Sequence, residues 1–259
     1  MRDMWAGAAA YDAYVGRWSR PVAAELVRWL AVPPGRTWLD VGCGPGALAA
    51  TVRELAAPGA VAGVDRSAPF VSAARAGGLP GVVADARELP FADGSVDVVV
   101  SGLAVNFVPR PASAVAELSR VVAPGGVVAA YVWDYAEGMA MLRHFWDAAV
   151  ALDPSAAELD EGERFGVCRP GPLERLWRLG GLAGVEVRPI DVPTVFAGFD
   201  DYWEPFLGGQ GPAPGYVAAL PEERRADLRS YLAARLPRTA TGRIELTARA
   251  WAVRGTRPA

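Results

Sequence analysis

The chain has 259 residues, of which 52% are hydrophobic, and its formal net charge is -3 at pH 7. This length and composition allow a large buried core and are untypical of a disordered chain. The small negative charge gives no general attraction to nucleic acid or to an anionic membrane, so we expect neither as a partner.

All 26 basic side chains are arginines, because the sequence contains no lysine, and this excludes a lysine nucleophile or a Schiff base. The two cysteines, Cys43 and Cys168, are far apart, and Cys43 lies in a glycine-rich turn that a disulfide would obstruct. A reducing cytoplasm is the simplest interpretation. No run reaches the ~18 apolar residues of a membrane span. One histidine and two distant cysteines do not form a metal-binding pattern, and no metal is expected.

The predicted elements begin with a helix that starts at Ser19 and Pro21 and ends before Pro33-Pro34. Apolar runs and helical patterns then alternate. Strands are expected at residues 37–42, 60–65, 81–85, 96–102 and 127–135, and helices at 48–57, 68–76 and 111–122. Strands that are apolar throughout and alternate with helices indicate a parallel sheet that is covered on both faces.

After Tyr135 the pattern changes. Residues 138–154 and 170–182 are predicted to be helical, and residues 185–196 and 244–255 are predicted to be strands. Between these two strands is an insertion of roughly 45 residues, from about 198 to 241, which is longer than an ordinary connection. We interpret this insertion as a functional cap.

The stretch "LDVGCGPGALA" places Gly42, Gly44 and Gly46 between a strand and a helix. Such a turn brings backbone N–H groups and a helix N-terminus to the crevice at the end of the strand, where a ligand can lie against the backbone. Gly42-x-Gly44-x-x-Ala47 also satisfies the dinucleotide fingerprint, with Asp65 at the position of a ribose acceptor. From this motif alone, a nicotinamide-dependent dehydrogenase remains an alternative.

Four segments together indicate which class of enzyme carries this glycine turn: "LDVGCGPGALA", "VDRS", "ADARELPFADGSVDVVVSGLAVNFV" and "ELSRVVAPGGVVAAYVW". In this order they resemble the class I S-adenosylmethionine-dependent methyltransferases, and most of all the bacterial small-molecule group that includes ubiquinone and menaquinone methyltransferases. The resemblance covers residues 11–133 and the terminal strands. It implies S-adenosylmethionine as the cofactor, S-adenosylhomocysteine as the product, and a small, partly apolar acceptor.

The implied fold is α/β, with a doubly wound, mostly parallel seven-stranded sheet, an antiparallel terminal strand and a helical cap. We expect a single methyltransferase domain over residues 1–259. Residues 1–34 would form N-terminal lid helices, residues 35–135 the cofactor-binding core, and residues 136–259 the substrate-side helices, the cap insertion and the terminal strand.

The resemblance also implies cofactor contacts. Asp40 is expected near the methionine ammonium group, and Asp65 is expected to accept hydrogen bonds from both ribose hydroxyls. Arg66 would flank the adenine, while Asp85 would accept from its amino group beside the N–H of Ala86. The glycine turn and the backbone after the fourth strand supply the remaining contacts: Gly42, Cys43, Gly44, Gly46, Ser101 and Leu103. Cys43 is interpreted as a small filler of the turn rather than a reactive thiol.

No catalytic residue is assigned, and three candidates follow from chemistry and position: His144, Asn106 and Asp134. His144 is the only histidine, but a lone histidine on a largely apolar helix is more often structural than catalytic. Asn106 stands after the fourth strand, where many relatives have a histidine pair. Substrate contacts are expected from aromatic residues: Tyr14, Trp133, Tyr135, Trp203 and Phe206. The cap aromatics can equally form the core of the cap itself.

Two alternatives to methyl transfer remain at this stage. The first is an NAD(P)-dependent reductase on a related nucleotide-binding fold. The second is a methyltransferase-like protein that binds the cofactor without turning it over.

Overall fold

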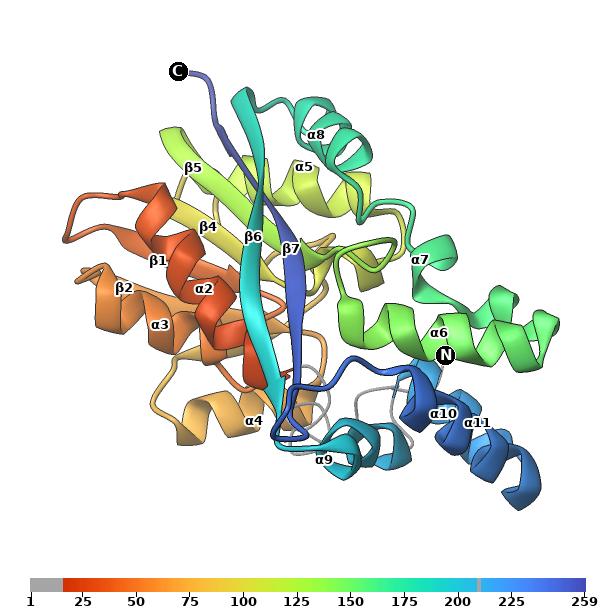
Figure 1. Ribbon diagram of the computed structural model, residues 1–259. Helices are drawn as coiled ribbons and strands as arrows, with labels where there is room; N and C mark the ends of the chain where they lie inside the picture. The colour runs from red at the N-terminus through yellow and green to blue at the C-terminus, as the bar shows by residue number, and fades with distance from the viewer. Residues whose placement is uncertain (1–15, 209–210) are drawn as a thin grey trace. The chain divides into compact units, whose positions relative to one another are not determined.

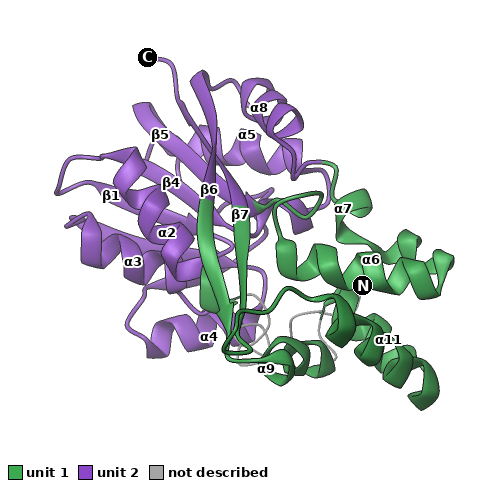
Figure 2. Cartoon of the chain, viewed as in Figure 1, with its two compact units in different colours: residues 1–18, 133–166, 191–249 green, residues 19–132, 167–190, 250–259 purple. Residues whose placement is uncertain are grey.

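The structure is a computed structural model that describes residues 16–208 and 211–259. The chain divides into two units, which Figure 2 shows in different colours. Residues 19–132, 167–190 and 250–259 form the first, which we call the sheet unit. The described residues of 1–18, with 133–166 and 191–249, form the second, which we call the helical unit.

Strands and helices alternate through the sheet unit, as expected from the sequence (Figure 1). In chain order its elements are α2 (Arg17–Leu30), β1 (Thr37–Val41), α3 (Ala47–Leu55), β2 (Ala60–Asp65), α4 (Ala68–Ala76), β3 (Gly81–Val83), β4 (Val96–Gly102), η2 (Val105–Phe107), α5 (Pro111–Val121), β5 (Val122–Trp133) and α8 (Pro170–Leu179). Two further strands, β6 (Ala183–Phe196) and β7 (Ile244–Thr256), belong partly to each unit, and the helical unit also includes the first two residues of α2 and the last residue of β5.

The seven strands form one sheet in the order β3-β2-β1-β4-β5-β7-β6. Strands β1 to β5 pair in parallel. Strand β7 runs antiparallel to β5. Backbone hydrogen bonds join Gly125 and Gly126, near the start of β5, to Arg257, directly after β7, and they join Asp134, directly after β5, to Arg249 within β7. The predicted doubly wound sheet with an antiparallel terminal strand is therefore confirmed.

The strand order also locates the crevice where ligands bind in such sheets. The chain moves outward in one direction through β1, β2 and β3, then returns to β4 on the other side of β1. Since parallel crossovers are right-handed, α3 and α4 cover one face, and α5 covers the other, where it packs beside α8 (Figure 1). The switch point lies at the carboxyl ends of β1 and β4.

Burial explains why the central strands read as apolar runs. Val98, Val99 and Val100 of β4 are at most 1% exposed, because β4 is paired on both sides and covered on both faces. Helix α2 is amphipathic instead, and it buries Val22 and Leu26 completely.

Several boundaries differ from the sequence prediction, and the structure shows the cause of two of these differences. Strand β5 begins at Val122 rather than 127, because Gly125 and Gly126 exchange backbone hydrogen bonds with Arg257, directly after β7, instead of ending a helix in a loop. Strand β3 ends at Val83 rather than 85, because Asp85 opens a turn in which its carbonyl accepts from the N–H of Glu88 at 3.0 Å.

The helical unit is built from short helices around an aromatic core. Its elements are α6 (Ala140–Leu152), η3 (Pro154–Leu159), α7 (Glu161–Arg164), α9 (Phe199–Trp203), η4 (Glu204–Gly208), α10 (Pro212–Ala219) and α11 (Glu222–Arg235). The rings of Phe145 and Phe206 stack with centroids 4.4 Å apart, and the hydroxyl of Tyr202 donates to the carbonyl of Met141 at 2.8 Å. Within the described ranges, no helix is long and apolar enough to cross a bilayer.

The helical unit also holds a buried carboxyl group. Glu161 is 2% exposed and accepts a hydrogen bond from the indole N–H of Trp146. Burial raises the pKa of Glu161 to about 7. Beside it, Asp160 pairs with both terminal nitrogens of Arg143.

Candidate functional site

Asp40, near the end of β1, is almost fully buried, with 1% exposed. Its Oδ2 accepts a hydrogen bond from the N–H of Ala49 at 3.1 Å, in the first turn of α3. The helix needs this acceptor, because its N-cap is Gly46, which has no side chain to pair with the free N–H groups. Oδ1 is also buried and has no hydrogen-bond partner among the described residues. Burial raises the pKa of Asp40 to about 7.

The three glycines of the turn have different surroundings. All have positive φ angles, 77° at Gly42, 52° at Gly44 and 100° at Gly46, which favour glycine. A Cβ on Gly42 would lie 2.3 Å from the Cβ of Ala104, and one on Gly46 would contact Leu79 at 3.5 Å. A Cβ on Gly44 would meet no atom within 4 Å. Gly44 is therefore the glycine that faces open space, whereas Gly42 is required by packing.

Asp65, the last residue of β2, joins the ends of the first two strands. Its Oδ2 accepts from the N–H of Gly44 at 2.9 Å, and its Oδ1 accepts from the N–H of Ser67 at 2.8 Å. Because each carboxylate oxygen has about two lone pairs, one acceptor position remains on each oxygen. The charge of Asp65 adds to the effect of burial in raising the pKa of Asp40.

Cys43 lies behind the turn. Its side chain is buried, and a Cβ on Gly63 of β2 would be only 2.8 Å from its Sγ. Burial raises the pKa of the thiol well above its ordinary value, and the charge of Asp40 raises it further. These observations agree with the predicted role as a small filler, since a reactive thiol needs a lowered pKa.

Asp85 opens the turn after β3, and its carboxylate pairs with Arg87 two residues later. Oδ1 accepts from the backbone N–H and the Nε of Arg87, each at 2.9 Å, and Oδ2 accepts from Nη2 at 2.5 Å. The hydrogen bonds from the guanidinium lower the pKa of Asp85 to about 2, and the charge of Arg66 acts in the same direction. Arg66 and Asp85 are therefore close, as expected of residues at the ends of adjacent strands. Ala86 is half-buried within the same turn.

The backbone after β4 is tightly constrained. Ser101 is 1% exposed, and Leu103 has a φ of 57°, which is unfavourable for a side chain with a Cβ. The N–H of Leu103 is held by the carbonyl of Tyr131 at 2.8 Å. In the following turn of η2, both the Oδ1 and the Nδ2 of Asn106 are buried without a hydrogen-bond partner in the described part of the chain.

In the helical unit, the residues after β5 have structural partners. The Oδ1 of Asp134 accepts from the N–H of Glu137 at 3.1 Å and so shapes the turn that leads to α6. The ring of Tyr135 tilts against Phe165 at 5.3 Å, and Trp133 is 1% exposed. The Nε1 of Trp133 is buried and has no partner within residues 16–208 and 211–259.

The remaining candidates are His144 and the cap aromatics. His144 is half-buried on α6, and burial lowers its pKa, although the charge of Asp147 opposes this shift. Trp203 and Phe206 are buried at 5% and 0% exposure, and their rings pack together at 6.0 Å. Their surroundings are those of a core, and their contact with an acceptor stays a prediction. Tyr14 lies outside the described residues, as does the rest of the expected N-terminal lid before residue 16.

Sequence reasoning missed Arg87, and it also missed Glu117 and Arg120 on α5, which bind the loop after Asp85. Both ion pairs are visible in the sequence as closely spaced opposite charges, in "DAR" at residues 85–87 and "ELSR" at residues 117–120. Such pairs usually lie on a solvated surface, so they did not indicate a functional role. Among the residues that the structure describes, no group of three or more His, Cys, Asp or Glu side chains could hold a metal ion.

Comparison with known proteins shows similarity to methyltransferases. Residues 39–130 match the model of the methyltransferase domain family. Over 195 residues the chain is 34% identical to 2-methyl-6-phytyl-1,4-hydroquinone methyltransferase from Synechocystis, an alignment that covers 70% of this chain and 57% of that protein. The chain spans about half the length of the curated relatives it matches.

Two solved structures show the same fold. Phosphoethanolamine N-methyltransferase 2 of Haemonchus contortus, crystallised with S-adenosyl-L-methionine, superposes with a TM-score of 0.61 at 19% identity and covers 100% of this chain and 59% of that one. The [4+2]-cyclase SpnF superposes with a TM-score of 0.54 at 18% identity, over 92% and 82% of the two chains. Residues 39–130 thus match the methyltransferase domain family, and the motif order and the strand order are those expected of the class I S-adenosylmethionine-dependent methyltransferases.

Proposed function

We propose that the protein transfers the methyl group of S-adenosylmethionine to a small, partly apolar acceptor by in-line displacement. The observation that carries the proposal is the group of Asp40, Gly44 and Asp65 at the ends of β1 and β2. It combines a buried carboxylate oxygen without a partner, a stretch of backbone open to a ligand, and a second carboxylate with two acceptor positions remaining.

These groups fit the parts of the cofactor one by one. Oδ1 of Asp40 would accept from the methionine ammonium, and that positive charge would restore ionisation to a carboxyl whose pKa burial raises. The two remaining acceptor positions of Asp65 match two adjacent ribose hydroxyls. The open face of Gly44 allows the ligand to lie against the backbone between them.

Asp85 would recognise the adenine. Three of its roughly four lone-pair positions are used by Arg87, which leaves one on Oδ2 for the amino group. The low pKa of Asp85 keeps this acceptor ionised at neutral pH. Arg66 and the N–H of Ala86 complete the adenine side, and the backbone at Ser101 and Leu103 would contact the methionine side.

The bound cofactor supplies an electrophilic methyl group on a sulfonium. The protein's contribution is to align the acceptor with that group and to exclude water, effects worth about 7–11 kcal/mol when the geometry is right. Among the residues that could contact the methyl acceptor, Asn106 is supported best. Its side-chain amide is buried, and neither its Nδ2 nor its Oδ1 has a hydrogen-bond partner in the described chain. We propose that this amide orients the nucleophilic atom of the acceptor.

The nature of the acceptor is inferred from the relatives. The Synechocystis relative is named for a phytyl-substituted hydroquinone, which combines hydroxyl groups with apolar carbon. Two buried thiols, Cys43 and Cys168, favour a reducing compartment, and we place the enzyme in the cytoplasm.

The test begins with calorimetric titration of S-adenosylhomocysteine, NADH and NADPH into the purified protein. The proposal requires binding of S-adenosylhomocysteine, whereas binding of a nicotinamide nucleotide alone would establish the reductase alternative. Mass spectrometry of phenolic and hydroquinone acceptors incubated with S-adenosylmethionine then looks for the mass of one added methyl group. Binding with no transfer to any member of a broad acceptor panel would favour a protein that keeps the cofactor without turning it over.

A further inference from the structure

The loop between β3 and β4, residues 84–95, carries Asp85, and its first turn is fixed at the start. The N–H of Ala84 donates to the carbonyl of Asp65 at 3.1 Å, which continues the β2–β3 pairing by one residue. The carbonyl of Asp85 accepts from the N–H of Glu88 at 3.0 Å and closes a turn of four residues. The direction of the Asp85 side chain therefore depends on where the other end of this turn is held.

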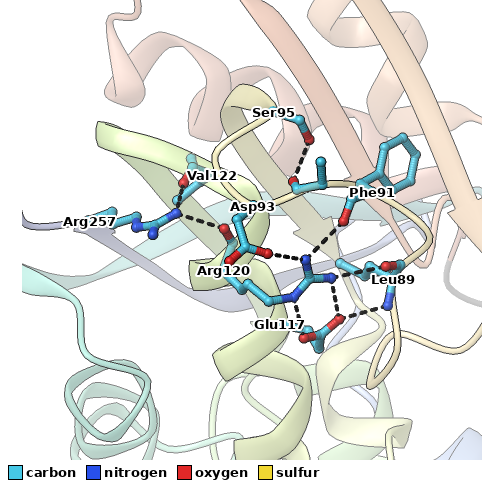
Figure 3. Close-up of polar contacts among 9 residues, drawn as sticks. Leu89, Phe91, Asp93, Ser95, Glu117, Arg120, Val122 and Arg257 are labelled. Carbon is cyan, nitrogen blue, oxygen red and sulfur yellow. Dashed lines mark hydrogen bonds and ion pairs between the residues drawn. The ribbon is translucent and has the colours of Figure 1, made fainter.

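That other end is Leu89, which α5 holds by both backbone groups. The N–H of Leu89 donates to Oε2 of Glu117 at 2.8 Å, and its carbonyl accepts from Nη2 of Arg120 at 3.0 Å (Figure 3). The Leu89 side chain is 4% exposed, so it is anchored by packing as well. The four residues that contain Asp85 are thus bracketed by β2 and α5.

Arg120 uses its whole guanidinium for this loop. Nε and Nη2 donate to the two oxygens of Glu117 at 2.7 and 2.8 Å, and Nη1 donates to the carbonyl of Phe91 at 2.9 Å and to Oδ1 of Asp93 at 2.6 Å (Figure 3). The bonds from Arg120 lower the pKa of Glu117, so both partners stay charged. A lysine has one nitrogen and cannot reproduce a planar fork that binds a carboxylate and two carbonyls together.

We infer that Arg120, with Glu117, is a positioning residue for adenine recognition: it holds the loop so that the Asp85 carboxylate meets the amino group of the cofactor's base. The inference rests on the proposed function, because it needs S-adenosylmethionine at this site. It goes further, since neither residue is expected to touch the cofactor. A salt bridge that only stabilised the fold would not change which base the protein prefers.

The experiment measures base preference in three variants. Dissociation constants are determined by calorimetry for S-adenosylhomocysteine and for its deaminated analogue S-inosylhomocysteine, which lacks the amino donor. The variants are Arg120→Ala, Arg120→Lys and, as a matched control, Arg257→Ala. Nη1 of Arg257 donates to the carbonyls of Arg120 and Val122 at the end of α5, but its described bonds do not reach residues 84–93.

We expect the wild type to prefer the adenine ligand by at least about tenfold, the value of one good hydrogen bond. Both Arg120 variants should lose most of that preference, and Arg257→Ala should keep it even if its melting temperature falls. The inference is overturned if the folded Arg120 variants retain the wild-type ratio, or if the wild type binds both ligands equally. In those cases binding of S-adenosylhomocysteine leaves the proposed function standing, whereas its absence would overturn the proposed function as well.

Hydrogen exchange on the wild type gives an independent reading that does not depend on the variants folding. The N–H groups of Arg87, Glu88, Leu89 and Phe91 are all bonded within the loop or to α5. If the loop is held in advance, peptides covering residues 85–93 should be protected to the same degree with and without S-adenosylhomocysteine. Protection that develops only with the ligand would show that the ligand, and not Arg120, orders the loop.

Discussion

Replacing Asp40 with asparagine should remove a specific pH dependence of the protein's stability. In the folded protein burial raises the pKa of Asp40 from 3.8 to about 7. Between these two values the folded protein holds a proton that the unfolded chain has released. The free energy of unfolding therefore falls as pH rises through this window, and the full cost is present above pH 7.

The magnitude follows from the shift. One pKa unit corresponds to about 1.4 kcal/mol, so the shift of Asp40 costs up to about 4 kcal/mol above pH 7, of which about 2.5 kcal/mol develops between pH 5 and pH 8. An asparagine at position 40 does not titrate, but its amide oxygen still accepts from the N–H of Ala49. Between pH 5 and pH 8, the free energy of unfolding should therefore fall by about 2.5 kcal/mol less in the variant than in the wild type.

Urea denaturation of both proteins at several pH values measures the difference, and subtraction removes other groups that titrate in the same range, including Glu161. A control is Asp97→Asn on the adjacent strand β4. Oδ2 of Asp97 accepts from the backbone N–H and the hydroxyl of Thr37, and these bonds lower its pKa. This carboxylate stabilises the fold above its unfolded pKa, so its loss should destabilise the protein at neutral pH.

Equal pH slopes for the wild type and Asp40→Asn would refute the reasoning, because Asp40 would then not exchange its proton in this window. The same variant separates stability from binding. It lacks the negative charge that the methionine ammonium needs, and its affinity for S-adenosylmethionine should fall by about 1.5–3 kcal/mol.

Three further predictions concern single residues. Asp65→Ala should weaken S-adenosylhomocysteine binding by about 1.5–3 kcal/mol in calorimetry, and an unchanged affinity in the folded variant would remove Asp65 from the ribose site. Gly44→Ala should fold, with a free energy of unfolding lower by about 1–2 kcal/mol in denaturation, since the φ is strained for alanine but its surroundings are open. Its Cβ should block cofactor binding, and a normal cofactor affinity would show that the ligand does not lie against Gly44. Trp203→Ala should lower the free energy of unfolding by about 3–5 kcal/mol, since this ring is buried among aromatic neighbours, and full stability with lost acceptor turnover would instead support a direct substrate contact.

The sequence was sufficient for the order and type of the elements in the sheet unit. Parallel strands buried on both faces, such as β4, leave uninterrupted apolar runs, and proline or glycine follows each intervening helix within a few residues. Boundaries were less accurate where the outcome depended on a distant partner. Whether Gly125 and Gly126 end a helix or join a strand is decided by Arg257 at the far end of the chain.

The glycine motif and the acidic residues at the strand ends could also be predicted, because their spacing along the chain carries the signal. The different roles of the glycines could not. Gly42 must lack a side chain because Ala104, from another strand's end, occupies the space, and nothing in the motif encodes that neighbour. Likewise, the spacing of Glu117 and Arg120 predicts a pair on one helix face but not the loop that the pair binds.

The buried position of Cys43 makes its rate of chemical modification a measure of how often the glycine turn opens. Its sulfur lies against Gly63 of β2, and the side chain is buried, so we expect a thiol reagent to reach it when the turn opens. The modification rate of Cys43 would therefore report the opening of the turn. The modification rate of Cys168, which is 1% exposed and precedes α8, would report local opening in a different part of the same unit. Comparing the two rates distinguishes local opening of the turn from local opening elsewhere in the unit, and no label has to be added to the protein.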